Sequence, residues 1–543
     1  MDTRDRASLN DILRTLDVPL AEGSRLRWTS PTGLALVLAR WISAEGRVRS
    51  LWIDAPTEAD AAALAHELSV LLPETGVAYF PGFSPFVGGE SSPPGIVLQD
   101  RLSTLIGLLE HRVQVLVSGP LAALEKLPHP SWFEKQKLEL RKGAEVPREL
   151  LLETLTELGF HRTDLAGSPG EFSARGLVVD IWPDHLADPL RLEFFGDELE
   201  RLCAFDSDTQ RRTGIELDSL TVYPRYEGRR SDPRRLMKAV ESRASLTPDP
   251  GDDLAFRRAR LASHGRFPGE ELFYPLLDQP AGQLAHWVPP CLRVQLEPEW
   301  AGALRERERA RTQAGLETLR RGGVVCPEFE DRFLGKDPSR PTVILTEFQS
   351  EADTPLHAQP VREFQGRLGE LADHLRELLA SGHRIFLAGS TSGMRDRLGE
   401  FLQEYELPVS HGTEPGCRGV HLPLGAGAHL KEARLLLLTE REVFGRKAMA
   451  PPPKKSRVSA FLSDLRDLKP GDRVVHMDHG IGRYIGLQSI PVGDSPHDCV
   501  ALEYAGGDKL YVPVENIDVL SRYGSDAESV ALDRLGGEAW QKR

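Results

Sequence analysis

Apolar residues along the first 135 positions fall alternately into helix-like and strand-like runs. The helix-like runs repeat at three- and four-residue spacing, whereas the strand-like runs are short and almost wholly apolar. The predicted helices span 34–42, 58–72 and 99–109, and the predicted strands span 51–54, 77–81 and 113–118. Strands that alternate with helices predict a parallel α/β sheet.

The pattern changes to strict alternation over residues 136–224. After a predicted helix at 147–158, apolar side chains recur at every second position, and Gly196-Asp197 provides a turn. The alternating positions are Leu177, Val179, Ile181, Leu190, Leu192 and Phe194. One buried face on each strand predicts a small antiparallel sheet backed by a helix.

Residues 225–447 return to an α/β pattern. A helix predicted at 304–321 alternates arginine with glutamate, which favours a solvated face. The last part, residues 346–447, predicts a small α/β unit, to which we assign the preceding strand 343–345 as well. Its further elements are helices at 364–379 and 395–405 and strands at 385–388 and 435–438.

The C-terminal region begins with a proline-rich segment. Ala450-Pro451-Pro452-Pro453-Lys454-Lys455 predicts an extended linker within 448–467. Beyond it, apolar residues alternate on two strands around the turn Gly506-Gly507-Asp508. They are Val500, Leu502 and Tyr504, then Leu510, Val512 and Val514. Short strands with glycine turns predict an SH3-like or Tudor-like β-barrel, a scaffold that offers a strand edge or loop to a partner protein.

Composition narrows the class of protein. A chain of 543 residues is too long for one core and predicts several domains, and no apolar run is long enough to cross a bilayer. The first ten residues are polar and do not form a secretory signal, which predicts a cytoplasmic protein. Five cysteines without a CxxC pair indicate neither a disulfide framework nor a zinc site.

The net charge of −14 favours contacts with proteins over contacts with DNA. Two basic clusters, at 225–230 and 454–457, are either solvated linker segments or phosphate contacts.

Nucleotide chemistry is not supported by the motifs. The position of a phosphate-binding loop reads Trp28-Thr29-Ser30-Pro31-Thr32-Gly33-Leu34, without the lysine that such a loop needs. Gly335-Lys336-Asp337 lacks the glycine spacing and the hydroxyl, and Gly389-Ser390-Thr391-Ser392-Gly393 is interpreted as a helix-capping turn. Glu297, where a magnesium-binding acid would lie, is followed by proline and is interpreted as a strand-end residue. We therefore predict no cofactor and no catalytic residue.

A metal site in the barrel is also not predicted. His476, His479 and Cys499 do not supply four ligands, and a turn between strands does not place both imidazoles on one helical face.

The barrel sequence "GDRVVHMDHGIGRYIGL … LEYAGGDKLYVPVENIDVLSRY" resembles the RNA-polymerase-interacting domain shared by CarD regulators and the Mfd family of bacterial transcription-repair coupling factors. The resemblance implies that a strand of the barrel pairs with the β subunit of RNA polymerase. The matching loop run, Gly486-Leu487-Gln488-Ser489-Ile490, implies contacts from Leu487, Gln488 and above all Ile490. An aliphatic residue at 490 could equally belong to the barrel core.

A second resemblance is independent of the first. The segments Phe80 to Phe86 and Asp100 to Leu105 resemble the UvrB-like module of the same coupling factors, which implies its P-loop-type α/β fold without ATPase chemistry. The run "GEFSARGLVVDIWP … LRLEFFGDELERLCAFDSDTQR" resembles the UvrB domain that docks onto UvrA.

The matching positions imply that Arg175 and, less directly, Arg162 bind UvrA, and UvrB has a further arginine where this chain has Ser173. The alternative is an ordinary surface arginine paired with Asp164 or Glu171.

These resemblances divide the chain into a multi-domain α/β protein with an inserted antiparallel sheet domain and a C-terminal barrel. The predicted units are 1–135 and 225–345 (two parts of the UvrB-like module), 136–224 (UvrA-binding), 346–447 (small α/β domain), 448–467 (linker), 468–530 (barrel) and 531–543 (start of the connection to a translocase motor).

No helicase motif occurs in the sequence. We therefore predict the N-terminal adaptor half of a coupling factor, which binds RNA polymerase and recruits UvrA to stalled transcription. The resemblance assigns ATP, magnesium and most DNA contacts to the motor. The alternatives are a CarD-like regulator with a non-catalytic appendage and a UvrB-type ATPase.

Overall fold

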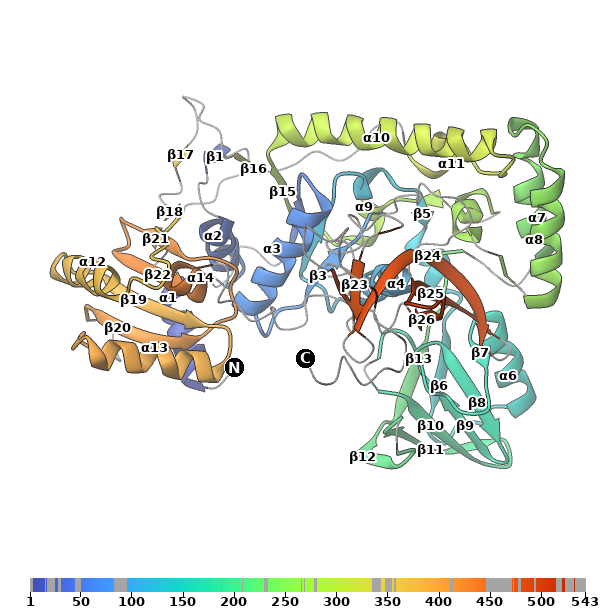
Figure 1. The fold of residues 1–543 in the computed structure, drawn as a ribbon. Coiled ribbons are helices and arrows are strands. Elements are labelled where there is room, and N and C mark those ends of the chain that lie inside the picture. The colour runs from blue at the N-terminus through green and yellow to red at the C-terminus, as the bar shows by residue number, and fades with distance from the viewer. Residues whose placement is uncertain are drawn as a thin grey trace.

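The structure is a computed structural model with a mixed α/β architecture and several separate sheets (Figure 1). It describes residues 3–14, 16, 25–27, 31–43, 50–82, 95–186, 188–207, 209–228, 233–264, 266–267, 269–277, 281–334, 343–346, 354–355, 358–410, 414–445, 471, 473–476, 480–492, 495–513, 520–522 and 532.

Residues 25–118 and 292–355 contribute the strands of a seven-stranded parallel sheet, which confirms the predicted parallel α/β pattern. Its strands come from two stretches of chain on either side of the inserted sheet. In spatial order they are β17 (Thr354–Pro355), β1 (Arg25–Arg27), β16 (Val343–Thr346), β15 (Leu292–Leu296), β2 (Leu51–Asp54), β4 (Val115–Ser118) and β3 (Val77–Phe80). Strand 343–345 pairs here with β1 and β15. Grouping it with the elements of the following unit was therefore wrong, whereas the predicted unit 225–345 includes it.

Helices surround this sheet. They are α2 (Pro31–Ser43), α3 (Glu58–Leu71), α4 (Gly95–Leu109), α5 (Pro130–Glu134), α9 (Leu284–Trp287), α10 (Pro298–Arg321), α11 (Phe329–Arg332) and the 3₁₀ turn η1 (Ala122–Leu124), with a small ladder of β5 (Leu127–Pro128) and β14 (Ala281–Gly282). The charged helix α10 begins six residues before its predicted start and is only partly solvated, because Leu304 and Leu316 are buried. Residues 233–277 form a further helical cluster rather than strands: α7 (Pro233–Glu241), η2 (Ala244–Leu246), α8 (Gly251–His264) and η3 (Glu270–Leu276).

The inserted segment folds as the predicted sheet backed by a helix, at the lower right of Figure 1. The sheet has the order β12 (Arg212–Glu216), β11 (Glu198–Phe205), β10 (Leu190–Phe195), β9 (Val178–Ile181), β8 (Glu171–Arg175) and β7 (His161–Arg162), accompanied by β6 (Leu138–Arg141), β13 (Ser219–Val222) and α6 (Arg148–Glu157). All of its ladders are antiparallel except that between β7 and β8. The alternating residues Val179, Ile181, Leu190, Leu192 and Phe194 lie together with α6 in one core.

A five-stranded sheet forms the small α/β unit at the left of Figure 1. Its order is β18 (Ala358–Gln359), β21 (Ala428–Leu430), β22 (Leu435–Thr439), β19 (Arg384–Gly389) and β20 (Gly416–His421), with α12 (Leu368–Ala380), α13 (Ser392–Glu404) and α14 (Glu440–Phe444). Both faces are buried, because Ile385 and Leu387 share a core with α12 and α13 whereas Phe386 and Ala388 face away from it.

The other face of this sheet is covered by the start of the chain. Helix α1 (Thr3–Arg14) and α2 share one core with Phe386 and Ala388. Arg384 Nη1 donates to the Asp11 carboxylate at 2.9 Å and 3.0 Å, and the His421 amide donates to Asp5 at 3.0 Å. The first helices and the 358–445 unit are therefore packed as one body.

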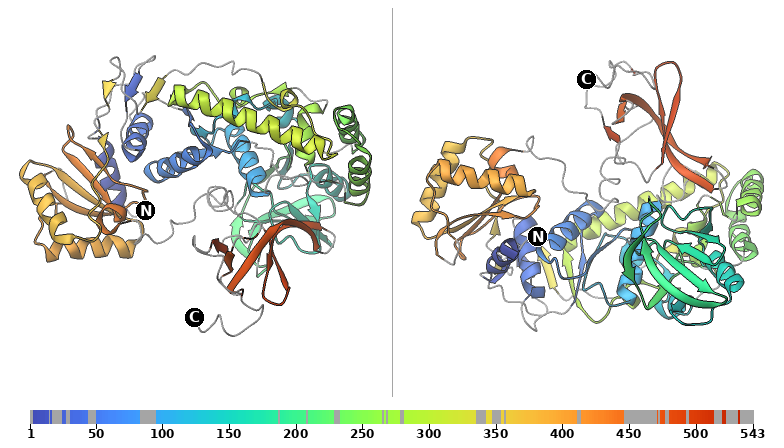
Figure 2. Two further views of the ribbon diagram at one scale, coloured as in Figure 1. Left: turned by 45° about the horizontal axis from the view of Figure 1, so that its top comes forward. Right: turned by 90° about the horizontal axis from the view of Figure 1, so that it is seen from below.

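The C-terminal sheet has five antiparallel strands in the order β26 (Lys509–Pro513), β25 (Ser495–Glu503), β24 (Gly480–Val492), β23 (Arg473–His476) and β27 (Leu520–Arg522). Its core contains the predicted Val500, Leu502, Tyr504 and Val512, and Val514 lies outside the described residues. Gly506 and Gly507 have φ of 100° and 87°, as the predicted turn requires. In the right-hand view of Figure 2 this sheet stands clear of the others.

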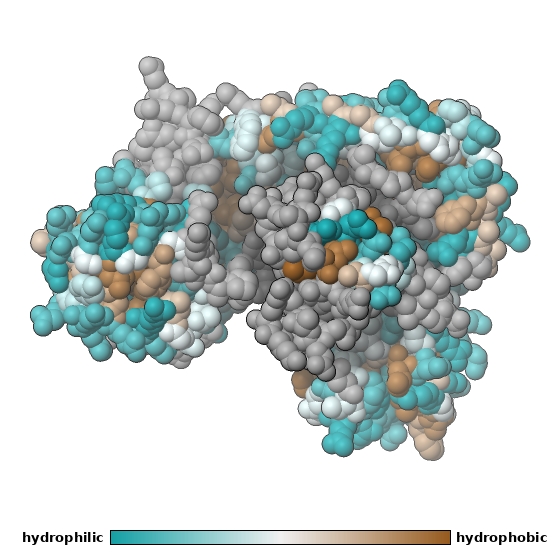
Figure 3. Space-filling model, viewed as in Figure 1, coloured by the Kyte–Doolittle hydropathy of each residue, from teal (hydrophilic) through white to brown (hydrophobic). Residues whose placement is uncertain are grey.

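Among the described residues, no helix is both long and apolar enough to cross a membrane. The face seen in Figure 3 is mainly hydrophilic, with scattered hydrophobic residues.

Candidate functional site

The position of a phosphate-binding loop, between β1 and α2, is lined by a carboxyl group. Residues 28–30 lie outside the described residues, and the helix starts at Pro31. The Thr32 hydroxyl, next to Gly33 at the start of α2, donates to Glu67 Oε1 at 3.4 Å. Burial raises the pKa of Glu67 to about 7, opposed by hydrogen bonds from the Gly425 amide and Thr32. A carboxyl group here disfavours a phosphate.

The predicted strand-end interpretation of Glu297 agrees with its surroundings. It follows β15, is buried, has a left-handed φ of 46° and accepts a hydrogen bond from the Thr346 hydroxyl at 3.2 Å. On the neighbouring strand, Asp54 is held by Arg293 at 2.7 Å. Both carboxylates at the carboxyl ends of these strands are thus engaged within the protein.

The turn at 389–393 caps a helix as predicted. The Met394 amide donates to the Thr391 hydroxyl at 3.2 Å, and the Ser390 amide donates to the buried Glu440 at 2.5 Å. The Gly335-Lys336-Asp337 segment lies outside the described residues.

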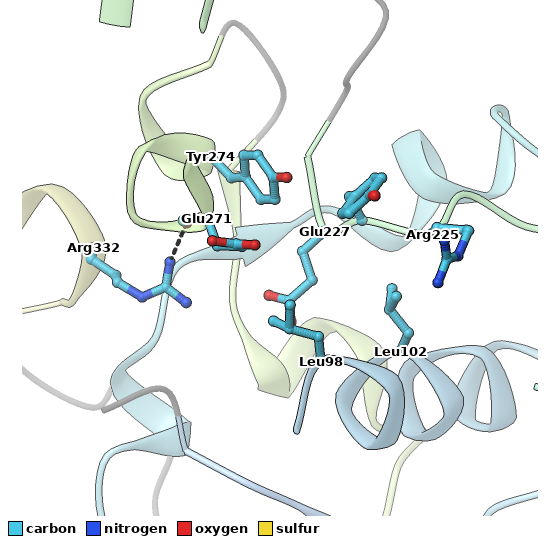
Figure 4. Close-up of a pocket in the computed structure, with 8 residues that line it drawn as sticks. Leu98, Leu102, Arg225, Glu227, Glu271, Tyr274 and Arg332 are labelled. Atoms are coloured by element: carbon cyan, nitrogen blue, oxygen red, sulfur yellow. Dashed lines mark hydrogen bonds between the residues drawn. The ribbon is translucent and has the colours of Figure 1, made fainter. Parts of the chain in front are cut away.

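A buried charge cluster joins α4 to η3, α11 and the segments that follow η1 and β13. The Arg101 guanidinium is fully buried and contacts Glu125 at 2.7 Å and Glu227 at 2.5 Å. Arg332 donates to the Glu271 carbonyl at 2.9 Å, the contact dashed in Figure 4. Burial lowers the pKa of Arg332 to about 10, opposed by Glu125. The charges compensate one another, so the cluster is interpreted as structural.

Arg175 lies at the end of β8 on the face of the inserted sheet that points away from α6. Its side chain is 52 % exposed, and Nη2 donates to Asp180 at 3.1 Å. Asp180 also accepts from Arg191 Nε at 2.7 Å and from Nη2 at 2.9 Å. The pairing with Asp164 or Glu171 that the sequence left open is replaced by this contact with Asp180.

Arg162 does not join Arg175. It lies on the edge strand β7, where its register partner is Phe172, whose side chain enters the core. Arg175 lies on the opposite face, three residues further along β8. Arg162 is exposed, and Ser173, on the face of Arg175, is buried. The two candidate arginines thus lie on different faces of the sheet.

The long strand β24 carries the three candidate residues for RNA polymerase binding. Ile490 lies within the strand, opposite His497, and the expectation that it lies in a loop was wrong. Leu487 lies opposite Val500, and the exposed Gln488 lies opposite Cys499. Strand β23 pairs with β24 at residues 480–483, so the part of β24 from 486 to 492 pairs with β25 alone among the described strands. The other edge of this part of β24 is therefore unpaired within the described residues.

Within the described residues, no group of three or more histidine, cysteine or acidic side chains could hold a metal ion. His479 lies outside them, and Cys499 is buried.

Three residues on the face of the inserted sheet that carries Arg175 were not identified from the sequence. They are Asp180, Arg191 and Phe195. Asp180 and Arg191 lie out of phase with the apolar residues of β9 and β10, and their opposite charges on adjacent strands were the signal for a pair. Phe195 is 75 % exposed at the end of β10, and the alternation that placed Phe194 in the core was the signal that Phe195 lies on the opposite face.

Two family matches coincide with these sheets. Residues 138–227 match the UvrB interaction domain, and residues 468–524 match the CarD-like/TRCF RID domain.

Several curated relatives match most of the chain, and the three that follow are named transcription-repair-coupling factor. The protein of Myxococcus xanthus is 29 % identical over 96 % of this chain and 48 % of its own length. Those of Bacillus subtilis (strain 168) and Escherichia coli (strain K12) are 26 % and 28 % identical over 88 % and 83 % of this chain, and over 43 % and 41 % of their own lengths. The chain thus spans about half the length of these relatives, and the predicted resemblance to the coupling factors is confirmed.

Proposed function

We propose that this chain is the adaptor part of a transcription-repair coupling factor, which binds RNA polymerase and recruits UvrA to stalled transcription for nucleotide-excision repair. The observation that carries the proposal is that one chain contains both a UvrB interaction domain and a CarD-like/TRCF RID domain, each coinciding with its own sheet. A chain that binds both systems brings the repair protein to the polymerase at a high effective concentration.

The RNA polymerase contact is assigned to the open edge of β24, with the β subunit as partner. An unpaired strand edge offers backbone N–H and C=O groups to a strand of another chain. Leu487, Gln488 and Ile490 lie along this edge, which supports their assignment. Replacing Ile490 with arginine is expected to weaken pull-down of RNA polymerase, and full-strength pull-down would remove this assignment.

The UvrA contact is assigned to Arg175, whose half-exposed guanidinium keeps donors available for a carboxylate. Arg162 remains a second candidate at the edge of the same sheet. Because the two lie on different faces, Arg175→Ala and Arg162→Ala are expected to differ in their effect on UvrA binding.

The finer architecture is also part of the proposal. The C-terminal sheet is assigned to an SH3-like barrel, and the seven-stranded sheet to a degenerate P-loop-type module. The domain boundaries are 1–135 with 225–345, 136–224, 346–447 and 468–530. The protein acts in the cytoplasm. The chain described here uses no cofactor and has no catalytic activity of its own. ATP, magnesium and DNA translocation are assigned to a motor.

The decisive experiment is reconstitution of a complex of three components. Tagged chain, RNA polymerase and UvrA of the same organism are mixed, and the chain is expected to retain both partners together. Retention of RNA polymerase without UvrA would instead favour a CarD-like regulator. Saturable ATP binding in isothermal titration calorimetry would favour the UvrB-type ATPase.

A further inference from the structure

Two histidine rings converge on the α12 side of the five-stranded sheet, at the left of Figure 1. His429 lies on β21 opposite Leu436, and His383 precedes Ile385 of β19 by two residues. Leu436 and Ile385 lie in the core beneath α12, so both histidines share that face of the sheet. Their Nε2 atoms lie 3.2 Å apart, and their ring centroids lie 5.2 Å apart.

Hydrogen bonds fix the position of the proton on His383. Its Nδ1 atom lies 3.2 Å from the Leu378 carbonyl oxygen and 2.8 Å from the Ser381 hydroxyl, which itself donates to the same carbonyl at 2.8 Å. A carbonyl oxygen only accepts, so Nδ1 carries the hydrogen and, in the neutral ring, Nε2 presents its lone pair to His429. Histidines that bind metal ions are typically held in this way through the other ring nitrogen.

Both rings are neutral near pH 7. Burial lowers the pKa of His383, and burial also lowers the pKa of His429 to about 4. Neutral imidazole is the form that binds a metal ion, so no proton has to be released to solvent first. Without a metal ion, Nε2–H of His429 donates to Nε2 of His383. With an ion bound, that hydrogen lies on Nδ1 of His429, and both Nε2 lone pairs point to the ion.

The distance between the two nitrogens suits two ligands of one ion. With zinc–nitrogen bonds of ~2.05 Å, a separation of 3.2 Å corresponds to an angle of about 100° at the metal, close to the tetrahedral value. His429 is partly exposed, so an ion can reach the pair from solvent. A third imidazole, that of His374 on α12, is near enough to lower the pKa of both rings.

We propose that His383 and His429 form a binding site for one divalent transition-metal ion, with zinc as the expected ion, and that Ser381 is a positioning residue for His383. Imidazole nitrogen is a preferred ligand of zinc, copper and nickel. Water fills the remaining positions, because the described residues offer no group of three ligands. The ion would join β21 to the segment between α12 and β19, so its role is structural and it adds no catalytic step.

The test is isothermal titration calorimetry of zinc chloride into the full chain, in buffer freed of metal ions at pH 7.5. The wild type is expected to bind zinc at one site per chain. His383→Gln and His429→Gln are each expected to weaken this binding at least ~10-fold. In hydrogen exchange, zinc should increase protection of peptides that cover β21 and residues 378–384 in the wild type, and not in His429→Gln.

A second pair of histidines provides the matched control. The rings of His286 and His129 lie 5.3 Å apart, almost as close as the proposed ligands. Nδ1 of His286, however, accepts from the Gln283 amide at 3.2 Å, so in the neutral ring Nε2 carries the hydrogen and offers no lone pair. His286→Gln should therefore leave the affinity for zinc unchanged.

Two further variants test the surroundings of the site. Ser381→Ala should weaken zinc binding ~10-fold, because the His383 ring loses one of the partners that orient it. Lys431, on the exposed turn after β21, lowers the pKa of His429 through its charge and opposes a bound cation. Lys431→Glu should therefore strengthen zinc binding, and its exposed position makes it safe for folding.

Three results would overturn the site. They are absence of saturable binding up to ~1 mM zinc, unchanged affinity in both glutamine variants, and unchanged affinity in Lys431→Glu. Circular dichroism shows whether the glutamine variants are folded. Where they are not, Lys431→Glu and the hydrogen-exchange pattern of the wild type decide.

Discussion

The carboxyl group of Glu67 is expected to make the contact between the first helices and the 358–445 unit weaker as the pH rises. It lies on α3, accepts from Thr32 on α2 and from the Gly425 amide, and thus bridges the two parts. Glu67 as a whole is partly exposed, but its Oε2 atom is buried and has no hydrogen-bond partner among the described residues. An ionised carboxylate in this position lacks the hydrogen bonds that would compensate its burial.

The size of the loss in folding free energy follows from the difference between the pKa of Glu67 in the folded and unfolded states. Burial raises the pKa of Glu67 from 4.5 to about 7. The folded state therefore holds a proton that the unfolded state has lost, so the stabilisation is complete below pH 4.5 and is lost as the pH rises through about 7. At ~1.4 kcal/mol for each unit of pKa, the loss reaches about 3 kcal/mol above pH 8 as an upper limit.

The assay is hydrogen exchange with mass spectrometry at pH 6 and pH 8.5, with exchange times scaled for the intrinsic rate. In the wild type, protection in peptides that cover α2, α3 and β21 should fall at the higher pH. Glu67→Gln, which cannot ionise, should keep the same protection at both values. Glu149→Gln is the control, because the Glu149 side chain is 89 % exposed. Equal pH dependence in the wild type and Glu67→Gln would refute the reasoning.

Three further predictions concern buried contacts. Ile12→Ala should lower the stability of the five-stranded sheet by about 2–4 kcal/mol, because Ile12 is fully buried against it, and faster hydrogen exchange in β20 would report the loss. Burial, together with His383, lowers the pKa of His429 to about 4, and the Nε2 atoms of the two rings lie 3.2 Å apart. The stabilisation that depends on neutral His429 is therefore present above pH 6.5 and lost as the pH falls toward 4. In thermal melts, His429→Gln should reduce the fall in melting temperature over this pH range. Arg101→Met leaves Glu125 buried without its main partner and should cost about 3–5 kcal/mol, seen as a lower melting temperature.

The elements that were predictable from sequence are those whose burial is visible in the local pattern. The strand Leu435–Thr439 is buried at every position, as its nearly continuous apolar sequence predicts for a strand with both faces covered. Thr391 was identified as a cap because hydroxyl residues before a helix satisfy its free amides. These signals are carried by residues close together in the chain.

The features that sequence reasoning missed depend on contacts between distant segments. Asp11 and Arg384 are 373 residues apart, and neither residue's neighbours indicate the pair. Strand β16 ends at Thr346, shortly before the first strand of the five-stranded sheet, β18, begins at Ala358, yet it pairs in the seven-stranded sheet.

The two candidate docking sheets have separate hydrophobic cores, and this separation has a consequence for their function. Phe194 and Ile181 belong to the core of the inserted sheet, whereas Val500 and Tyr504 belong to that of the C-terminal sheet, with no residue in common. Within the described residues, a surface substitution on one sheet therefore does not reach the other through a shared core. An adaptor needs this independence, because loss of one partner must leave the other contact intact. Variants of the two sheets should accordingly separate UvrA binding from RNA polymerase binding.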